Sequence, residues 1–279
     1  MQQVTRKTLG AGINLTCVTT PKFKRAVLRA MLVLPLGGED AALRACLPQV
    51  LRRGTAKLND MQAFGTALDE LYGARIEAAV RKEGENLCIG FLSDCIDEAY
   101  APGADGLTAG VIGLLCDLLY DPYLQDGLFC AAYVEGERGN LIDRIAALKN
   151  DPRSWAPRRL NEIMCENEDY GKSALGTIEQ AERITPETLY AAYRRALSEA
   201  QVELFYCGTM MPDEVEARFM ATPLAQPREG TLYQPYTVVQ ARPAGDVREI
   251  VEDAEVTQGK LSLGFRTGGA SLTGGEPAA

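Results

Sequence analysis

The chain has 279 residues, a formal net charge of −9 and no histidine. Without imidazoles it cannot form a Ser-His-Asp triad, a Cys-His dyad or a histidine-ligated metal site of its own. The acidic balance, with no basic run longer than two residues, argues against nucleic acid as a partner, because proteins hold phosphate backbones with a basic face.

The cysteine and hydropathy patterns are typical of a protein from a reducing compartment. The eight cysteines form no C-x-x-C pair, and several stand in apolar stretches, which predicts buried, reduced thiols. No apolar run approaches the roughly 20 residues that span a bilayer, and the first residues lack the apolar core of a signal peptide. We therefore expect a soluble, cytoplasmic protein with no membrane partner.

The first part of the chain predicts the order strand, strand, helix, helix, strand, strand. Residues 12–20 and 25–35 have the alternating or continuous apolar character of strands. Residues 39–53 follow helical spacing, with Gly54 placed as a C-terminal cap. Pro48 lies inside this predicted helix, so we expect the helix to be bent or interrupted there, with the Arg44 carbonyl left without its usual donor.

The next helix is predicted to begin at Asn59, with Gln62 completing a capping box, and to end at Gly73. A hairpin of residues 74–81 and 86–93 follows. The remaining predicted elements are helices over 104–119, 126–149 and 153–166, a helix capped by Thr185 that runs to about Leu197, a strand over 202–207 and a short helix from Pro212 to about Met220.

Four segments, taken in order, resemble the pitrilysin/insulinase (M16, inverzincin) family of zinc peptidases over about residues 10–220. They are ALRACLPQVLRRGT, LDELYGARIEAAVRKEGENLCIGF, YGKSALGTIEQAERITPETLYAAYRRAL and VELFYCGTMMPDEV. Active members of the family carry His-x-x-Glu-His on a helix that is soon followed by Gly-Thr, and Gly54-Thr55 fixes the register of this motif here.

In that register the zinc site is erased. Ala45 and Gln49 stand at the two histidine positions, and Pro48 stands where the general base belongs. The family's third ligand lies seven residues after a Glu-Arg pair that matches Glu137 and its neighbour, and this position holds Arg144. Alanine has no lone pair, proline has no carboxylate and arginine is a cation, so the resemblance implies no zinc, no other cofactor and no peptidase activity. The retained scaffold should still bring Ala45, Gln49 and Arg144 together, with Glu137 bordering the same pocket.

The resemblance also implies the architecture. We expect an α+β fold with a mostly antiparallel sheet covered by helices on one face. Residues 1–221 would form the inactive N-terminal domain, the proline-rich residues 222–245 a linker, and residues 246–279 the truncated beginning of a second homologous domain. The alternation over 247–267 predicts that domain's first strand, and this tail should be poorly ordered or dock onto the first domain or onto another molecule.

Several functions remain open at this point. The first is a non-catalytic subunit that pairs with an active, histidine-bearing paralogue and supplies a chamber wall or a peptide-binding surface. The second is a stand-alone module that binds a peptide or protein without an enzymatic partner. The third is an enzyme of another kind, using Cys46 or the carboxylates of Glu135 and Glu137. The zinc-less pattern is similar to a bacterial branch of the family associated with 5-aminopentanol modification of elongation factor P.

Overall fold

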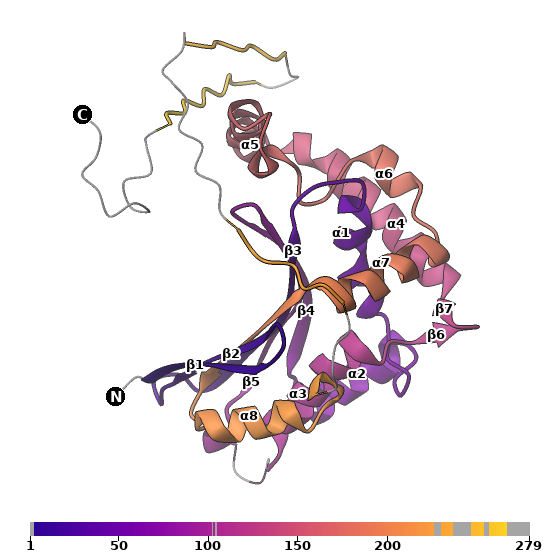
Figure 1. The fold of residues 1–279 in the computed structure, drawn as a ribbon, viewed down its shortest axis with the longest axis vertical. Helices are drawn as coiled ribbons and strands as arrows, with labels where there is room; N and C mark the ends of the chain where they lie inside the picture. Colours follow the sequence, from indigo (N-terminus) through magenta and orange to yellow (C-terminus); the bar gives the residue numbers. More distant parts are fainter. Residues whose placement is uncertain are drawn as a thin grey trace.

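A computed structural model of the chain describes residues 3–101, 103, 105–225, 230–236, 247–253 and 257–266. Its centre is a six-stranded sheet in the order β1-β2-β8-β3-β5-β4 (Figure 1). The strands are β1 (Gln3–Gly10), β2 (Ile13–Thr19), β3 (Arg25–Pro35), β4 (Arg75–Glu83), β5 (Asn86–Ile96) and β8 (Gln201–Gly208), with a separate small hairpin of β6 (Leu124–Gln125) and β7 (Leu128–Phe129). Only the β2–β8 pair is parallel, so the sheet is mostly antiparallel, as predicted.

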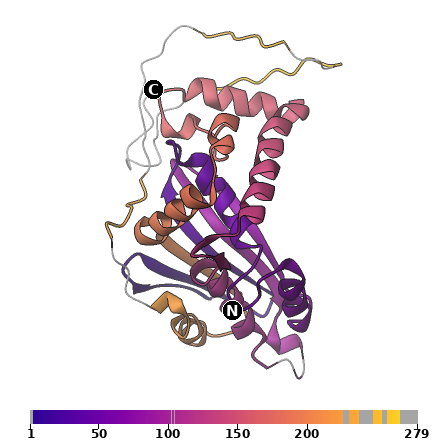
Figure 2. The same ribbon diagram turned by 90° about the vertical axis from the view of Figure 1, so that its right-hand side faces the viewer.

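The helices lie on one side of this sheet, which confirms the predicted layering (Figures 1 and 2). They are α1 (Ala41–Leu51), α2 (Met61–Glu70), α3 (Leu107–Tyr120), α4 (Ala131–Ala146), α5 (Pro152–Met164), α6 (Ile178–Glu182), α7 (Pro186–Glu199) and α8 (Pro212–Met220). Helices α1, α3 and α7 pack against central strands, whereas α5 lies at the end of the molecule beside the turns that flank it. Within the described ranges, no helix is both long and apolar enough to cross a membrane.

The main core lies between the sheet and the helices, because alternate residues of each strand point to the same face. In β8 every second residue is buried, and Tyr206 is its largest fully buried side chain. The opposite face carries a smaller apolar cluster of Met31, Val33, Ala79 and Cys88, onto which Tyr233 packs. Tyr233 belongs to the predicted linker, so this side chain lies against the open face of the sheet, while most of residues 230–236 are exposed.

Three local predictions need correction. Residues 3–10 form strand β1, which has no apolar face of its own and pairs only with β2. The helix predicted over 126–149 begins at Ala131, because Asp126 and Gly127 adopt positive φ angles of 50° and 81° and turn the chain into the β6–β7 hairpin. Helix α2 is capped by Asp60, whose side chain accepts a hydrogen bond from the Ala63 backbone, and not by Asn59.

The predicted strand over 247–267 is also wrong for the residues that the structure describes. Residues 247–253 and 257–266 form no strand, because they meet side chains near α5 rather than the backbone edge of a sheet. The contacts are three ion pairs: Arg159–Glu252 at 2.6 Å, Arg248–Glu166 at 2.9 Å and Arg266–Glu168 at 2.6 Å. These segments therefore contact α5 and the turn that follows it through ion pairs, while nearly all of their residues stay exposed. The assignment of 246–279 to a second domain stays a prediction, and most of the linker over 222–245 lies outside the described residues.

Candidate functional site

Helix α1 carries the positions at which active relatives would hold zinc. Ala45 is fully buried, Pro48 is buried and Gln49 is half-buried. The helix is not interrupted at Pro48, contrary to one form of the prediction. Pro48 lies in the last turn, where its missing N–H removes one bond to the Arg44 carbonyl, while the Arg52 N–H still donates to the Pro48 carbonyl at 3.1 Å and closes the helix.

Helix α4 packs against α1 and supplies the other two predicted positions. Glu137 is nine-tenths buried and faces the end of α1, where Arg53 Nε donates to its Oε1 at 2.6 Å. The second carboxylate oxygen accepts a hydrogen bond from Asn140 Nδ2 at 3.1 Å. Arg144 is exposed in the last turn of α4. Glu137 is thus a structural ion-pair partner, whereas Arg144 is free to meet solvent.

The Gly-Thr pair after α1 makes a tight turn that aims Arg53 at α4. A side chain on Gly54 would place its Cβ 2.7 Å from the Leu58 carbonyl oxygen, which only glycine avoids. The Thr55 N–H donates to that same carbonyl at 2.7 Å, and the Thr55 hydroxyl accepts from the Leu58 N–H at 3.1 Å. The feature that fixed the motif's register is therefore a structural turn, and it is intact.

The second Gly-Thr pair holds the opposite end of α1. Gly176 has a φ of 73°, and a Cβ there would come within 2.7 Å of the Ala42 backbone nitrogen. Thr177 and Gln180 form a capping box that begins α6, and Gln180 Nε2 also donates to the Gly38 carbonyl at 3.2 Å. Helix α1 is therefore fixed at its start by α6 and at its end by the contact with α4.

The residues of an alternative enzyme are not arranged for catalysis. Burial raises the pKa of the Cys46 thiol to about 12, and the nearby charges of α4 act on the same group. Cys46 is consequently a neutral core thiol at pH 7. Glu135 is exposed and pairs with Arg138 at 3.2 Å, whereas Glu137 points toward Arg53, so the two carboxylates do not share a site. Across the described residues, no three His, Cys, Asp or Glu side chains are grouped as a metal site.

The charges of α4 that act on Cys46 include Glu137, Arg138 and Arg144, so α4 runs beside this part of α1. This is the neighbourhood in which the ligand positions were expected to meet. The convergence of Ala45, Gln49 and Arg144 on one point stays a prediction.

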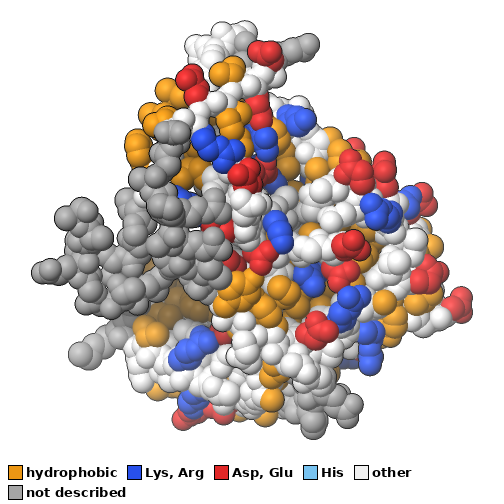
Figure 3. Space-filling model, turned by 45° about the horizontal axis from the view of Figure 1, so that its top comes forward, with side chains coloured by type: hydrophobic (Ala, Val, Ile, Leu, Met, Phe, Trp, Pro, Cys, Tyr) orange, Lys and Arg blue, Asp and Glu red, His pale blue; other side chains and the backbone are white. Residues whose placement is uncertain are grey.

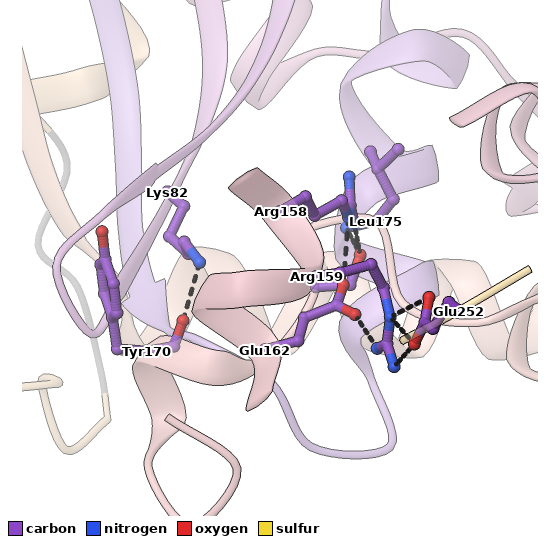
Figure 4. A network of polar contacts seen from close by, with 8 residues as sticks. Lys82, Arg158, Arg159, Glu162, Tyr170, Leu175 and Glu252 are labelled. Atoms are coloured by element: carbon purple, nitrogen blue, oxygen red, sulfur yellow. Dashed lines mark hydrogen bonds and ion pairs between the residues drawn. The ribbon is translucent and has the colours of Figure 1, made fainter. Parts of the chain in front are cut away.

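A second site, which the sequence analysis did not find, is a hollow of about 390 Å³ beside α5. Its lining combines cations with small polar groups (Figure 4). The lining residues are Lys82, Leu148, Ser154, Arg158, Asn161, Glu162, Gly171, Lys172, Ser173, Ala174 and Leu175. In the sequence only Arg158, Arg159 and Glu162 lie together, on α5, whereas Lys82 comes from β4 and Lys172 from the turn after residue 171, so no single stretch of sequence shows the cluster.

No protein-family model matches the chain. The chain is 30% identical over 262 residues to "Probable inactive metalloprotease YmfF" of Bacillus subtilis, a match that covers 94% of this chain and 61% of that protein. The chain thus spans less than two thirds of this relative's length.

Among solved structures, a conserved protein from Enterococcus faecalis superposes with a TM-score of 0.75 at 24% identity, over 85% of this chain and 57% of that one. A peptidase M16 inactive domain from Pseudomonas fluorescens superposes with a TM-score of 0.61 at 15% identity, over 84% and 53%. These likenesses establish the fold. The fold is that of M16-like peptidase domains, and the sequence likeness is to a probable inactive metalloprotease, which supports the predicted resemblance to the inactive branch of the pitrilysin/insulinase (M16) family.

Proposed function

We propose that this chain acts as a non-catalytic M16 subunit that pairs with an active zinc-peptidase paralogue and contributes a chamber wall or a peptide-binding surface. The proposal rests on a contrast between the retained packing of α1 and the absence of zinc ligands on it. The turn at Gly54 and the Arg53–Glu137 pair keep α1 and α4 packed, although neither helix offers a zinc ligand at the matching positions. Helix packing that is retained at positions without zinc ligands fits a role in assembly or binding.

The open face of the sheet supports this role. No helix of the described ranges covers it, and its polar part is ordered by side-chain contacts between strands. Arg6 of β1 holds Glu203 of β8 through two bonds of 2.8 and 2.9 Å, and Asn14 of β2 donates to the same carboxylate at 3.0 Å. A flat, ordered and partly polar face of this kind suits contact with a peptide or with a second subunit.

The test is to mix the purified chain with a paralogue that carries His-x-x-Glu-His. We expect a defined complex by light scattering at micromolar concentration, and peptide hydrolysis by the paralogue that depends on the presence of this chain. The control is the paralogue with its general-base glutamate replaced by glutamine, which should still bind but not hydrolyse. If no complex forms at micromolar concentration, the partner role is refuted.

The alternative is a stand-alone peptide- or protein-binding module. It is favoured by the polar, cationic hollow beside α5, which is formed within this chain and needs no second subunit. Capture of a peptide by the isolated chain, without any effect on a histidine-bearing paralogue, would support it. The cytoplasmic location and the link to 5-aminopentanol modification of elongation factor P also stay proposals. A test of the latter is loss of the modification when the gene is deleted.

A further inference from the structure

The hollow beside α5 concentrates positive charge in an acidic protein. Its lining holds three cations, Lys82 from β4, Arg158 from α5 and Lys172 from the following turn. Glu162, the one carboxylate of the lining, pairs with Arg158, and Asp169 pairs with Lys172, so Lys82 is the lining cation without an ion pair among the described residues. The remaining polar lining groups are neutral. In Figure 3 this end of the molecule comes forward, and Lys and Arg side chains gather on it next to Asp and Glu. In a chain with a net charge of −9, such a local excess of cations needs a specific reason.

Lys82 is oriented by neutral groups. Lys82 Nζ donates to the Tyr170 carbonyl at 2.7 Å and lies 4.3 Å from the centre of the Tyr170 ring. No ion pair of Lys82 occurs among the residues that the structure describes. Burial lowers the pKa of Lys82, and the nearby charge of Arg158 lowers it further, so an anion bound beside Lys82 would stabilise its charged form.

Arg158 is held in place but is not fully neutralised. Its Nη2 donates to the Ser173 hydroxyl at 2.6 Å, and its Nε donates to Glu162 at 3.2 Å. Glu162 has a second guanidinium partner, because its other carboxylate oxygen accepts a hydrogen bond from Arg159 Nη1 at 2.5 Å. Two guanidinium groups thus share Glu162, and Arg159 has a further carboxylate partner in Glu252 (Figure 4).

The chain itself shows which ligand suits this cluster. Glu252, from the segment 247–253, places its carboxylate on Arg159 at the rim of the hollow. Arg159 Nε donates to its two oxygens at 2.9 and 3.2 Å, and Arg159 Nη2 donates at 2.6 Å. A forked guanidinium–carboxylate contact of this kind is geometrically selective. A carboxylate of an extended segment is thus already bound to Arg159, whose neighbour on α5, Arg158, faces the hollow.

We propose that the hollow lined by Lys82, Arg158 and Lys172 is a binding site for the carboxylates of an acidic peptide, with Arg159 at its rim. The segment around Glu252 occupies the rim of the site in the isolated chain and competes with the peptide. This inference gives the peptide-binding surface proposed above a location and a ligand class. It concerns the isolated chain, so it can fail while pairing with a paralogue succeeds, and the reverse.

The experiment measures binding of a short fluorescein-labelled Glu-rich peptide to the full 279-residue chain by anisotropy at low salt, beside its Gln-rich counterpart. We expect the Glu-rich peptide alone to bind. Lys82→Met and Arg158→Met should each weaken binding about tenfold or more, the effect of losing one charged hydrogen bond. Lys57→Met is the matched control, since it removes the same charge from an exposed lysine paired with Asp117, and it should leave binding unchanged.

Glu252→Gln should tighten binding several-fold, because it frees Arg159 from its internal partner, and circular dichroism verifies the fold of each variant. Equal binding of the two peptides, or equal effects of Lys82→Met and Lys57→Met, would overturn the proposal. Free glutarate distinguishes the source of the carboxylate. If glutarate displaces the peptide at equal concentration, the site belongs to a small dicarboxylate and the peptide assignment is wrong.

Discussion

Replacing Glu137 with alanine should destabilise the fold by about 2 kcal/mol. The side chain is only 10% exposed, and its carboxylate accepts bonds from Arg53 at 2.6 Å and from Asn140 at 3.1 Å. A hydrogen bond to a charged group contributes about 1.5–3 kcal/mol, and breaking a buried pair costs about 3–5 kcal/mol. Arg53 is 33% exposed, so water can reach its guanidinium group once Glu137 is removed. The expected loss of unfolding free energy therefore lies toward the lower end of these values.

The matched control is Glu135→Ala on the same helix. Glu135 is 77% exposed and makes one ion pair with Arg138 at 3.2 Å, so its removal should change stability by less than about 0.5 kcal/mol. Urea unfolding followed by circular dichroism measures both variants, with an unchanged slope and a lower midpoint expected for Glu137→Ala. Arg53→Ala and the double variant complete a cycle, with a coupling of about 1–2 kcal/mol expected. Equal effects of the two glutamate substitutions, or no coupling to Arg53, would refute a structural role for Glu137.

Three further predictions follow from the site and the tail. Purified protein should contain no stoichiometric zinc, because Ala45, Gln49 and Arg144 cannot ligate it; about one tightly bound zinc per chain by elemental analysis would contradict the register. Cys46 should resist iodoacetamide at pH 8 in the native state, since burial raises its pKa to about 12, and should react only after unfolding. Hydrogen bonds from Arg159 lower the pKa of Glu252, so the contribution of this contact is complete above the ordinary pKa of about 4.3 and is lost as pH falls through the lower folded value. Limited proteolysis of residues 247–253 should therefore accelerate below about pH 4, and an unchanged rate in a chain that stays folded would count against the contact.

Elements with local signals were predicted correctly from the sequence. Thr185 followed by a proline marks the start of α7, and the structure has Thr185 in a capping box with Thr188. Strand β1 was missed although its partner β2 is close in the sequence, because its own residues show little apolar alternation. Lys7 pairs with Asp213 and with Glu216 of α8, and no pattern within residues 3–10 reports those contacts.

The α1 site and the hollow beside α5 also differ in whether a local sequence signal marks them. The ligand positions on α1 could be proposed because they lie at fixed spacing from Gly54, whose turn is a local feature, and their register stays a prediction. The hollow beside α5 could not, because its cations come from three separate parts of the chain. In the sequence, Arg158 and Arg159 form one two-residue basic run. In the structure their side chains point to different partners: Arg158 faces Ser173 in the hollow and Arg159 faces Glu252 at its rim.

The packing of α1 is compatible with the predicted loss of the zinc site. The contacts that fix α1 avoid the ligand positions: Gly176 and Gln180 hold its start, and Arg53 with Glu137 holds its end. Ala45, at one histidine position, is fully buried and contributes to the hydrophobic core. A buried imidazole would need polar partners, whereas a buried alanine needs none, so the substitution removes a requirement instead of leaving a defect. Loss of catalysis is therefore compatible with an unchanged fold, and any remaining selection on this chain would act through its surfaces.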